Sequence, residues 1–168
     1  GSGDTTADAT GLSHTGTLGT GPTIDSADPL WITGVTGKAL SFDGSNDRVA
    51  IADAADLDFA GSFTLEAWVQ RAATGAAHCI VSKGDSQRRN FWMVIDSSNR
   101  VDFRWESSGG TNHGATSSAI ITNTAWHHIA CVWDATLGQN RIYVDGVAVQ
   151  TKSGSGTPII NGDPVHIG

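Results

Sequence analysis

Apolar and polar residues alternate along most of the chain from Ala39 onward, in short runs separated by turn residues. The clearest run is residues 63–70, FTLEAWVQ, in which apolar odd positions alternate with Thr, Glu, Trp and Gln. A period of two is typical of a β-strand with one buried face. No stretch shows a convincing helical period of 3.6 residues. The pattern therefore predicts an all-β protein.

Further strands are predicted by the same alternation and by the turn residues that bound each run. The pair Asp145-Gly146 stands between two β-branched runs, which is a strong signal for a two-residue hairpin. Residues 1–30 have few apolar anchors and are expected to form a long loop with one short strand. About nine to ten strands of this spacing indicate a sandwich or a barrel. The further runs are 14–18, 39–42, 48–51, 78–84, 90–96, 100–106, 126–134, 140–150 and 164–168.

The composition narrows the class of protein. The 168 residues suit one domain, and 21 glycines with a net charge of −7 fit a loop-rich β-protein. Asp supplies 15 of the 17 acidic residues, so the acidity is expected in turns. The few basic residues form no patch that would favour nucleic acid, and no run is long enough to insert into a membrane. Cys79 and Cys131 fit one disulfide or two buried thiols equally well.

The order of the segments resembles a known family. DATGLSHTGTL, GKALSFDGSNDRV, SFTLEAWV, IVSKGD, WHHIACVWD, RIYVDGVAV and PVHIG together resemble the laminin G-like domain of the concanavalin A-like lectin/glucanase superfamily. The resemblance covers nearly the whole chain. It implies two antiparallel sheets stacked as a jelly-roll β-sandwich. It also implies an extracellular module that binds glycans or proteins, often with calcium, within an adhesin or a multidomain glycan-degrading enzyme.

The two ends depart from the family pattern. Family members usually begin with an apolar strand before a turn like GSG and close with a strand after the equivalent of HIG. We therefore expect one domain over residues 1–168 that is a portion of a longer chain and lacks the family's first and last strands. The alternative is an open sheet edge that a partner segment completes, either from the rest of the chain or from another subunit.

Catalytic chemistry is not expected. Glucanases of this superfamily carry an E-x-D-x-x-E arrangement on one strand, and retaining glycosidases need two carboxyl groups about 5–5.5 Å apart. Glu66 has Thr64 and Trp68 as its neighbours on the same face, and neither is acidic. Glu106 likewise has no carboxylate two residues away. The chain is predicted not to be an enzyme, with Glu66 a hydrogen-bonded scaffold residue between the sheets.

A calcium site is one interpretation of the acidic turn FDGSND. Asp43, Asn46 and Asp47 supply oxygen atoms of the kind that Ca²⁺ prefers. The alternative is turn chemistry alone, because Asp and Asn side chains accept hydrogen bonds from nearby backbone amides. Both interpretations stay open from the sequence, and a bound calcium ion would have a structural role.

Candidate ligand-binding residues come from the aromatic and polar positions of residues 90–106 and the segment that follows. Sugar sites combine an aromatic platform with hydrogen-bonding side chains. Trp92 and Trp105 lie on the two strands that flank SSN, and alternation turns Arg104 and Asp102 to the other side of the strand from Trp105. The polar segment 106–118, which contains Asn112, is expected to be a long loop that forms either a binding rim or a solvated linker.

Other aromatic and basic residues are not included in the predicted ligand-binding set. Trp68, Trp126 and Trp133 are expected in the core because they lie on the most strongly patterned strands. Arg88 and Arg89 could pair with an acidic glycan or form part of the charged surface.

The sequence thus predicts a non-catalytic, extracellular or cell-surface module that binds carbohydrate or mediates adhesion within a larger surface protein. One alternative is a structural protein–protein module, such as a stalk, sheath or filament subunit. The other is an accessory module of a glycan-degrading enzyme. The expected partners are a glycan or a surface protein, without nucleic acid and without membrane insertion.

Overall fold

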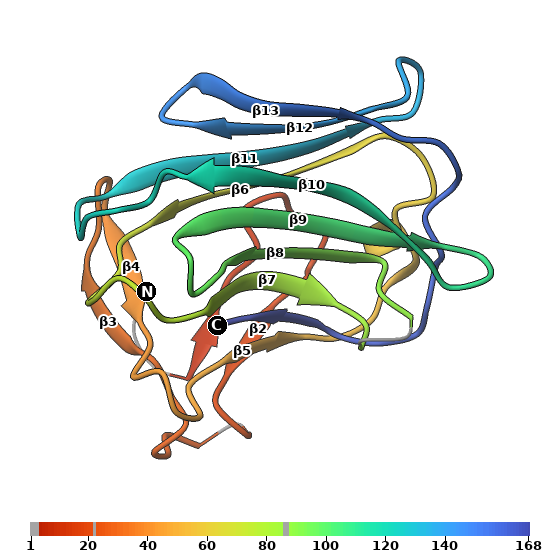
Figure 1. Ribbon diagram of the computed structural model, residues 1–168. Helices are drawn as coiled ribbons and strands as arrows, with labels where there is room; N and C mark the ends of the chain where they lie inside the picture. The colour runs from red at the N-terminus through yellow and green to blue at the C-terminus, as the bar shows by residue number, and fades with distance from the viewer. Residues whose placement is uncertain (1–3, 22, 86–87) are drawn as a thin grey trace. The chain divides into compact units, whose positions relative to one another are not determined.

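The computed structural model describes residues 4–21, 23–85 and 88–168 (Figure 1). Their contacts divide into two compact units. The first unit runs up to Leu57 and includes Gly162–Gly168, and the second comprises Asp58–Asn161. The described residues form fourteen strands and one short 3₁₀ turn, with no α-helix among them. In this part of the chain no helix is long and apolar enough to cross a membrane. That residues 1–168 form one domain stays a prediction.

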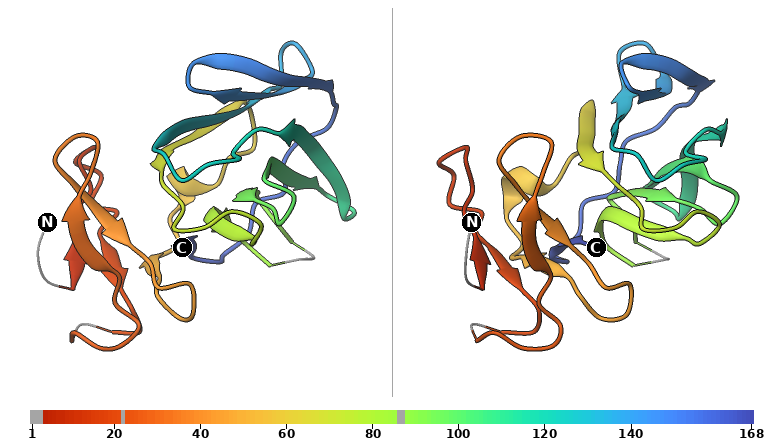
Figure 2. Two further views of the ribbon diagram at one scale, coloured as in Figure 1. Left: turned by 60° about the vertical axis from the view of Figure 1, so that its left-hand side comes forward. Right: turned by 90° about the vertical axis from the view of Figure 1, so that its left-hand side faces the viewer.

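The first unit consists of short antiparallel strands. Strand β2 pairs with β1 on one side and with β5 on the other, and β5 pairs in turn with β14. Strands β3 and β4 form a separate hairpin, drawn in orange in Figure 2. Only β2, β4, β5 and β14 had been predicted. The elements are β1 (Thr5–Thr6), β2 (Gly16–Leu18), β3 (Leu30–Thr33), β4 (Lys38–Ser41), β5 (Val49–Ile51), η1 (Ala55–Leu57) and β14 (Val165–Ile167).

The second unit contains two antiparallel sheets. In one sheet the strands follow the order β7-β8-β9-β10, and in the other the order is β13-β12-β11-β6. The elements are β6 (Phe63–Val69), β7 (His78–Lys83), β8 (Phe91–Ile95), β9 (Arg100–Ser107), β10 (Thr111–Ala119), β11 (His127–Asp134), β12 (Gln139–Val144) and β13 (Val147–Ser153).

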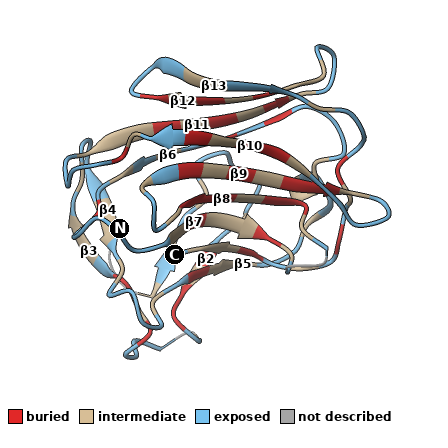
Figure 3. Ribbon diagram, viewed as in Figure 1, coloured by how far each residue is buried: buried red, intermediate tan, exposed pale blue. Residues whose placement is uncertain are grey.

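Aromatic side chains pack between these two sheets. The Phe63 ring of β6 lies 5.7 Å from the Phe103 ring of β9, and the Trp105 ring of β9 lies 4.6 Å from the Trp133 ring of β11. Buried residues alternate with more exposed ones along β6, β9, β11 and β12 (Figure 3). The second unit is therefore a β-sandwich, with the core on the faces that the sequence alternation predicted.

The hairpin between β12 and β13 turns at the predicted dipeptide. Asp145 and Gly146 both have positive φ, 50° and 79°. Two consecutive positive values are characteristic of a type I′ turn, whose twist matches that of the flanking strands. The Asp145 side chain adds two contacts: its carboxylate accepts a hydrogen bond from the His128 backbone N–H at 2.9 Å and lies 2.8 Å from His127 Nδ1.

The prediction of a long loop over residues 106–118 was wrong. Residues 108–110 form a turn, and Thr111–Ala119 form β10, which pairs with β9. The strand was hidden because its buried positions are Ala115 and Ser117 rather than large apolar residues. Gly114 has a φ of 129°, and a Cβ there would lie 1.9 Å from the Phe103 carbonyl oxygen. Only glycine fits this backbone.

The residues predicted to be buried differ in their exposure. Trp133 is buried, as predicted, but Trp68 is 53% exposed, so its assignment to the core was wrong. Glu66 was also misplaced between the sheets, because its side chain is 65% exposed. Of the two possibilities for the cysteines, the structure has free thiols: Cys79 is half-buried and Cys131 is buried.

Candidate functional site

The outer face of the sheet that contains β8, β9 and β10 carries an ordered set of polar side chains. Alternation along β9 turns Phe103 and Trp105 into the core and Asp102 and Arg104 outward. Cross-strand partners share a face, so the pairings of β9 with its two neighbours define rows across the sheet. We call this surface the polar sheet face; its residues are Trp92, Val94, Asp102, Arg104, Asn112 and Thr116.

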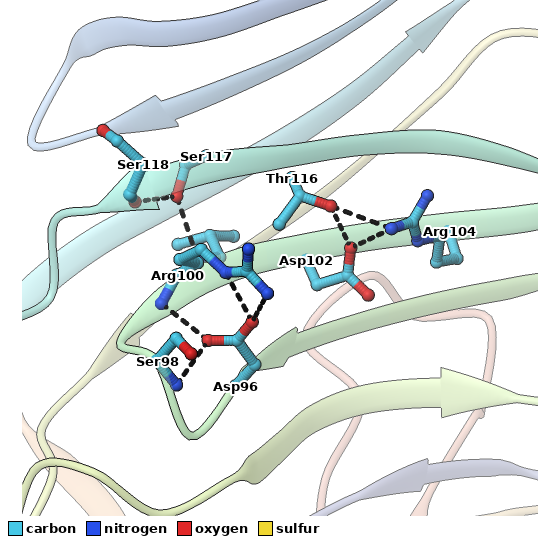
Figure 4. A network of polar contacts seen from close by, with 9 residues as sticks. Asp96, Ser98, Arg100, Asp102, Arg104, Thr116, Ser117 and Ser118 are labelled. Carbon is cyan, nitrogen blue, oxygen red and sulfur yellow. Dashed lines mark hydrogen bonds and ion pairs between the residues drawn. The ribbon is translucent and has the colours of Figure 1, made fainter.

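Three side chains from β9 and β10 form a closed hydrogen-bonded cluster in the middle of this face (Figure 4). Arg104 Nη2 lies 2.8 Å from Asp102 Oδ1 and donates a hydrogen bond to Thr116 Oγ1, also at 2.8 Å. The Thr116 hydroxyl in turn donates to Asp102 Oδ1 at 2.6 Å. The side chains of Arg104 and Asp102 are 29% and 16% exposed, so both still meet solvent. The cluster presents a carboxylate and a guanidinium with fixed orientations.

A second cluster surrounds Trp92. The guanidinium carbon of Arg89 lies 4.1 Å from the centre of a Trp92 ring, which is cation–π geometry. Arg89 Nη1 donates to Asn112 Oδ1 at 3.3 Å and lies 3.6 Å from Glu106 Oε1. The buried Glu106 carboxylate also accepts the Arg89 backbone N–H at 3.2 Å. These contacts hold the half-buried Trp92 ring and the exposed Asn112 amide in defined positions.

Another ion pair lies in the turn between β8 and β9, at one end of the polar sheet face. Arg100 contacts Asp96 Oδ2 through Nε at 2.8 Å and through Nη2 at 2.7 Å. Asp96 Oδ1 accepts the backbone N–H groups of Ser98 and Arg100, each at 2.9 Å. Partial burial raises the pKa of Asp96, but these hydrogen bonds outweigh it and bring the pKa below its usual value. The Asp96 carboxylate therefore stays charged and closes the turn.

Of the four predicted ligand-binding residues, the structure places Trp92, Arg104 and Asn112 on the polar sheet face. Trp105 must be removed from the set, because its side chain has no exposed surface. Its ring stacks on His113 at 4.2 Å, and its Nε1 donates to Asn140 Oδ1 at 2.8 Å. Trp105 and Arg104 are adjacent on one strand, so they point to opposite faces and could not line one surface.

Three members of the arrangement were not in the predicted ligand-binding set. Asp102 shares the parity of Arg104 along β9, so alternation was the signal that could have included it. Thr116 could not be found, because β10 was not recognised as a strand. Arg89 had been left between acidic-glycan binding and surface charge; it contacts Trp92, Asn112 and Glu106, whereas Arg88 is exposed.

The predicted calcium ligands lie together in one turn of the first unit. Asp43 Oδ1 accepts the Ser45 N–H at 2.8 Å, and Asp47 Oδ2 accepts the Asp43 N–H at 2.8 Å. The backbone hydrogen bond from Ser45 is the main reason that the pKa of Asp43 is lowered. The carboxylate oxygens are ligands of the kind that Ca²⁺ prefers. The hydrogen bonds that they accept, however, are enough to hold the turn closed. No group of three or more His, Cys, Asp or Glu residues poised for a metal occurs within the described ranges, and the calcium site stays a prediction.

The two glutamates do not come together. Glu66 lies on β6 in one sheet, exposed, with its Oε2 3.8 Å from His128 Nε2. Glu106 lies on β9 in the other sheet and is buried. The pair therefore does not form the closely spaced carboxylates of a retaining glycosidase. That the chain is not an enzyme remains a prediction.

The first unit has a hollow of its own. A cavity of about 390 Å³ is lined mostly by apolar atoms and includes Leu12, His14 and Asp56. His14 Nε2 lies 2.8 Å from Asp56 Oδ2. At its edge, a hydrogen bond from the Thr10 hydroxyl is the largest of the effects that lower the pKa of Asp8 to about 2. These contacts link neighbouring loops of the unit. We therefore interpret the cavity as part of the unit's own packing.

Comparison with known proteins agrees with this architecture. Residues 43–168 match Laminin_G_3, the family described as the concanavalin A-like lectin/glucanases superfamily. No curated protein matches the chain significantly. The predicted class, an all-β antiparallel jelly-roll sandwich of the concanavalin A-like type, is confirmed.

Two solved structures illustrate the similarity. A botulinum neurotoxin type C structure, described as depending on two ganglioside molecules for cell entry, is 14% identical with a TM-score of 0.73 over 96% of this chain and 39% of that one. The CBM40 of the Ruminococcus gnavus IT-sialidase, bound to α2,3 sialyllactose, is 17% identical with a TM-score of 0.59 over 68% and 67%. The chain thus spans about two fifths of the toxin chain. At these identities the likeness shows the fold.

Proposed function

Because the chain belongs to the concanavalin A-like lectin/glucanase superfamily through its Laminin_G_3 region, residues 43–168, we propose that it is a non-catalytic carbohydrate-binding module. The polar sheet face is the proposed binding surface. The observation that carries the proposal is the combination, on one face, of a half-buried Trp92 and the fixed donors and acceptors of Asp102, Arg104 and Asn112.

This combination suits a sugar for a simple reason. A pyranose ring has an apolar C–H face and a rim of hydroxyl groups that both donate and accept hydrogen bonds. An aromatic ring can pack on the C–H face, while a carboxylate and a guanidinium pair with neighbouring hydroxyls. Because the side chains are already held by one another, little conformational freedom is lost when a ligand binds. The ganglioside and sialyllactose named for the two similar structures support the same general class of ligand.

The cellular setting is part of the proposal. An extracellular or cell-surface location, in which the module serves adhesion within a larger protein, is in keeping with the family's lectin description. An accessory module of a glycan-degrading enzyme would use the same face, and the similar CBM40 is part of the Ruminococcus gnavus IT-sialidase.

A glycan array tests the proposal, run with the purified protein in calcium and again with a chelator. We expect binding to a coherent set of glycans and a strong loss of signal in Trp92→Ala and Arg104→Ala. The matched control is Trp68→Ala, which removes an exposed tryptophan from the outer face of the other sheet. No signal in either condition, or equal loss in the control, would refute the assignment. The chelator arm tests the calcium prediction separately.

A further inference from the structure

We infer that the polar sheet face selects uncharged glycans over sialylated ones, an inference that rests on the proposed function. The reason is that three arginines on or beside this face, Arg104, Arg89 and Arg100, already have carboxylate partners. Arg104 pairs with Asp102, Arg89 with Glu106 and Arg100 with Asp96, at 2.8, 3.6 and 2.7 Å. A sugar carboxylate would have to share or displace one of these partners.

Arg104 lies in the middle of the face, with its side chain 29% exposed. Its Nη2 contacts both Asp102 and Thr116, and these contacts fix the plane of the guanidinium. A ligand carboxylate bound to the same guanidinium would lie close to Asp102 Oδ1. Like charges at such a separation repel each other appreciably even near the protein surface. The Asp102 carboxylate therefore acts against an acidic ligand, while it can still accept a hydrogen bond from a hydroxyl group.

The other two arginines offer no better anchor. The Arg89 side chain is only 13% exposed, because Trp92 lies against its guanidinium and Glu106 and Asn112 take its Nη1. Arg100 already contacts Asp96 Oδ2 through both Nε and Nη2, two of the nitrogens that a ligand carboxylate would need. The net charge of −7 for the whole chain further disfavours the approach of an anion.

An uncharged sugar meets none of these obstacles. Its hydroxyls can donate to the Asp102 carboxylate and accept from the Arg104 guanidinium or the Asn112 amide without breaking an ion pair. Its C–H face can pack on the half-buried Trp92, which lies opposite Arg104 on the adjoining strand. The face thus has partners for every part of a neutral sugar and no unpaired cation among its described side chains for a carboxylate.

The test uses pairs of oligosaccharides that differ only by a terminal sialic acid, beginning with lactose and sialyllactose and extending to an array of such pairs. Titration calorimetry with the wild-type protein should give at least roughly fivefold tighter binding of the neutral member, a difference large enough to measure. Asp102→Asn keeps the shape and removes the charge, so the ratio should fall toward one or reverse. Glu66→Gln removes one negative charge from the outer face of the other sheet and should leave the ratio unchanged.

The outcomes separate the two claims. Tighter binding of the sialylated members by the wild-type protein would overturn the selectivity, as would an unchanged ratio in a folded Asp102→Asn protein. If Asp102→Asn does not fold, the wild-type ratio alone decides. Failure to bind any member of either series would contradict the proposed function itself.

Discussion

The outer faces of the two sheets in the second unit differ in how their side chains are held. On the polar sheet face, Asp102, Arg104 and Thr116 contact one another at hydrogen-bonding distance. On the outer face of the other sheet, Trp68 is 53% exposed, and Glu66 makes one loose contact with His128 at 3.8 Å. Both faces carry a tryptophan and charged groups, so composition does not distinguish them.

The difference teaches that preorganisation, rather than residue type, marks the candidate site. Side chains that are fixed before a ligand arrives lose less entropy on binding and present a defined pattern of donors and acceptors. The exposed Trp68 and Glu66 share one neighbour, His128, whose ring centre lies 5.3 Å from that of Trp68 and whose Nε2 lies 3.8 Å from Glu66 Oε2, so a ligand would have to order them further. The same contrast decides which variants are expected to change stability and which are expected to change affinity.

The largest expected effect is a loss of stability, and it comes from a change in the buried layer beneath the polar sheet face. Trp105→Ala removes a fully buried ring that packs on Trp133 and donates to Asn140, and it should lower the free energy of unfolding by about 3–5 kcal/mol. Trp68→Ala, on the exposed face, should change it by no more than about 0.5 kcal/mol. Urea unfolding followed by tryptophan fluorescence measures both. Similar losses in the two variants would contradict the assignment of Trp105 to the core.

The next effect is on affinity. Trp92→Ala removes the aromatic surface of the polar sheet face and the contact with Arg89, and it should weaken glycan binding at least about tenfold, which corresponds to about 1.4 kcal/mol. Trp68→Ala should leave the affinity within about a factor of two. Titration calorimetry with a glycan selected on the array gives both values. A greater loss in Trp68→Ala would move the site to the other sheet.

A smaller effect is expected from the hydroxyl that joins Asp102 to Arg104. Thr116→Val keeps the side-chain shape and removes both hydrogen bonds, so it should cost about 1 kcal/mol of stability. Thr64→Val makes the same change at an exposed position on β6 and should be nearly neutral. Thermal melts of the two variants measure the difference. Equal melting temperatures would show that the cluster is not preorganised by Thr116.

The smallest expected effect is a pH dependence beneath the same face. Burial is the main cause that lowers the pKa of His113, which stacks on Trp105, below its ordinary value of 6.5. The unfolded chain then binds a proton more readily than the folded one, so stability falls as the pH drops below about 6.5 toward the lowered pKa. His113→Gln should lose less stability than the wild type between pH 7.5 and pH 5.5. Parallel urea titrations at the two pH values would contradict this if the losses were the same.

Strands with one clearly apolar face could be predicted from the sequence. Alternation located β6, and Asp145-Gly146 located the β12–β13 hairpin, because local chemistry alone specifies that turn. Strand β10 could not be predicted, since its inward positions are small or polar and show no apolar alternation, although it pairs with β9 across the short turn at residues 108–110. Its absence from the prediction also hid Thr116.

The candidate site was predicted only in part, because residue type was given more weight than the alternation along the strand. Alternation correctly separated Arg104 from Trp105, yet aromatic type alone drew Trp105 into the ligand-binding set. Trp68 was assigned to the core because its strand is strongly patterned, although its position has the parity of the exposed Glu66. In each case the period of two was more informative than the chemistry of the single residue.

The central claim is that the polar sheet face is the carbohydrate-binding surface, and an NMR titration tests it most directly. Amide and indole resonances of the labelled protein would be followed as the strongest glycan from the array is added. The account predicts shifts at Trp92, Asp102, Arg104, Asn112 and Thr116, with Trp68 and His128 unchanged. Shifts confined to Trp68, Glu66 and His128, with the polar sheet face unperturbed, would contradict it.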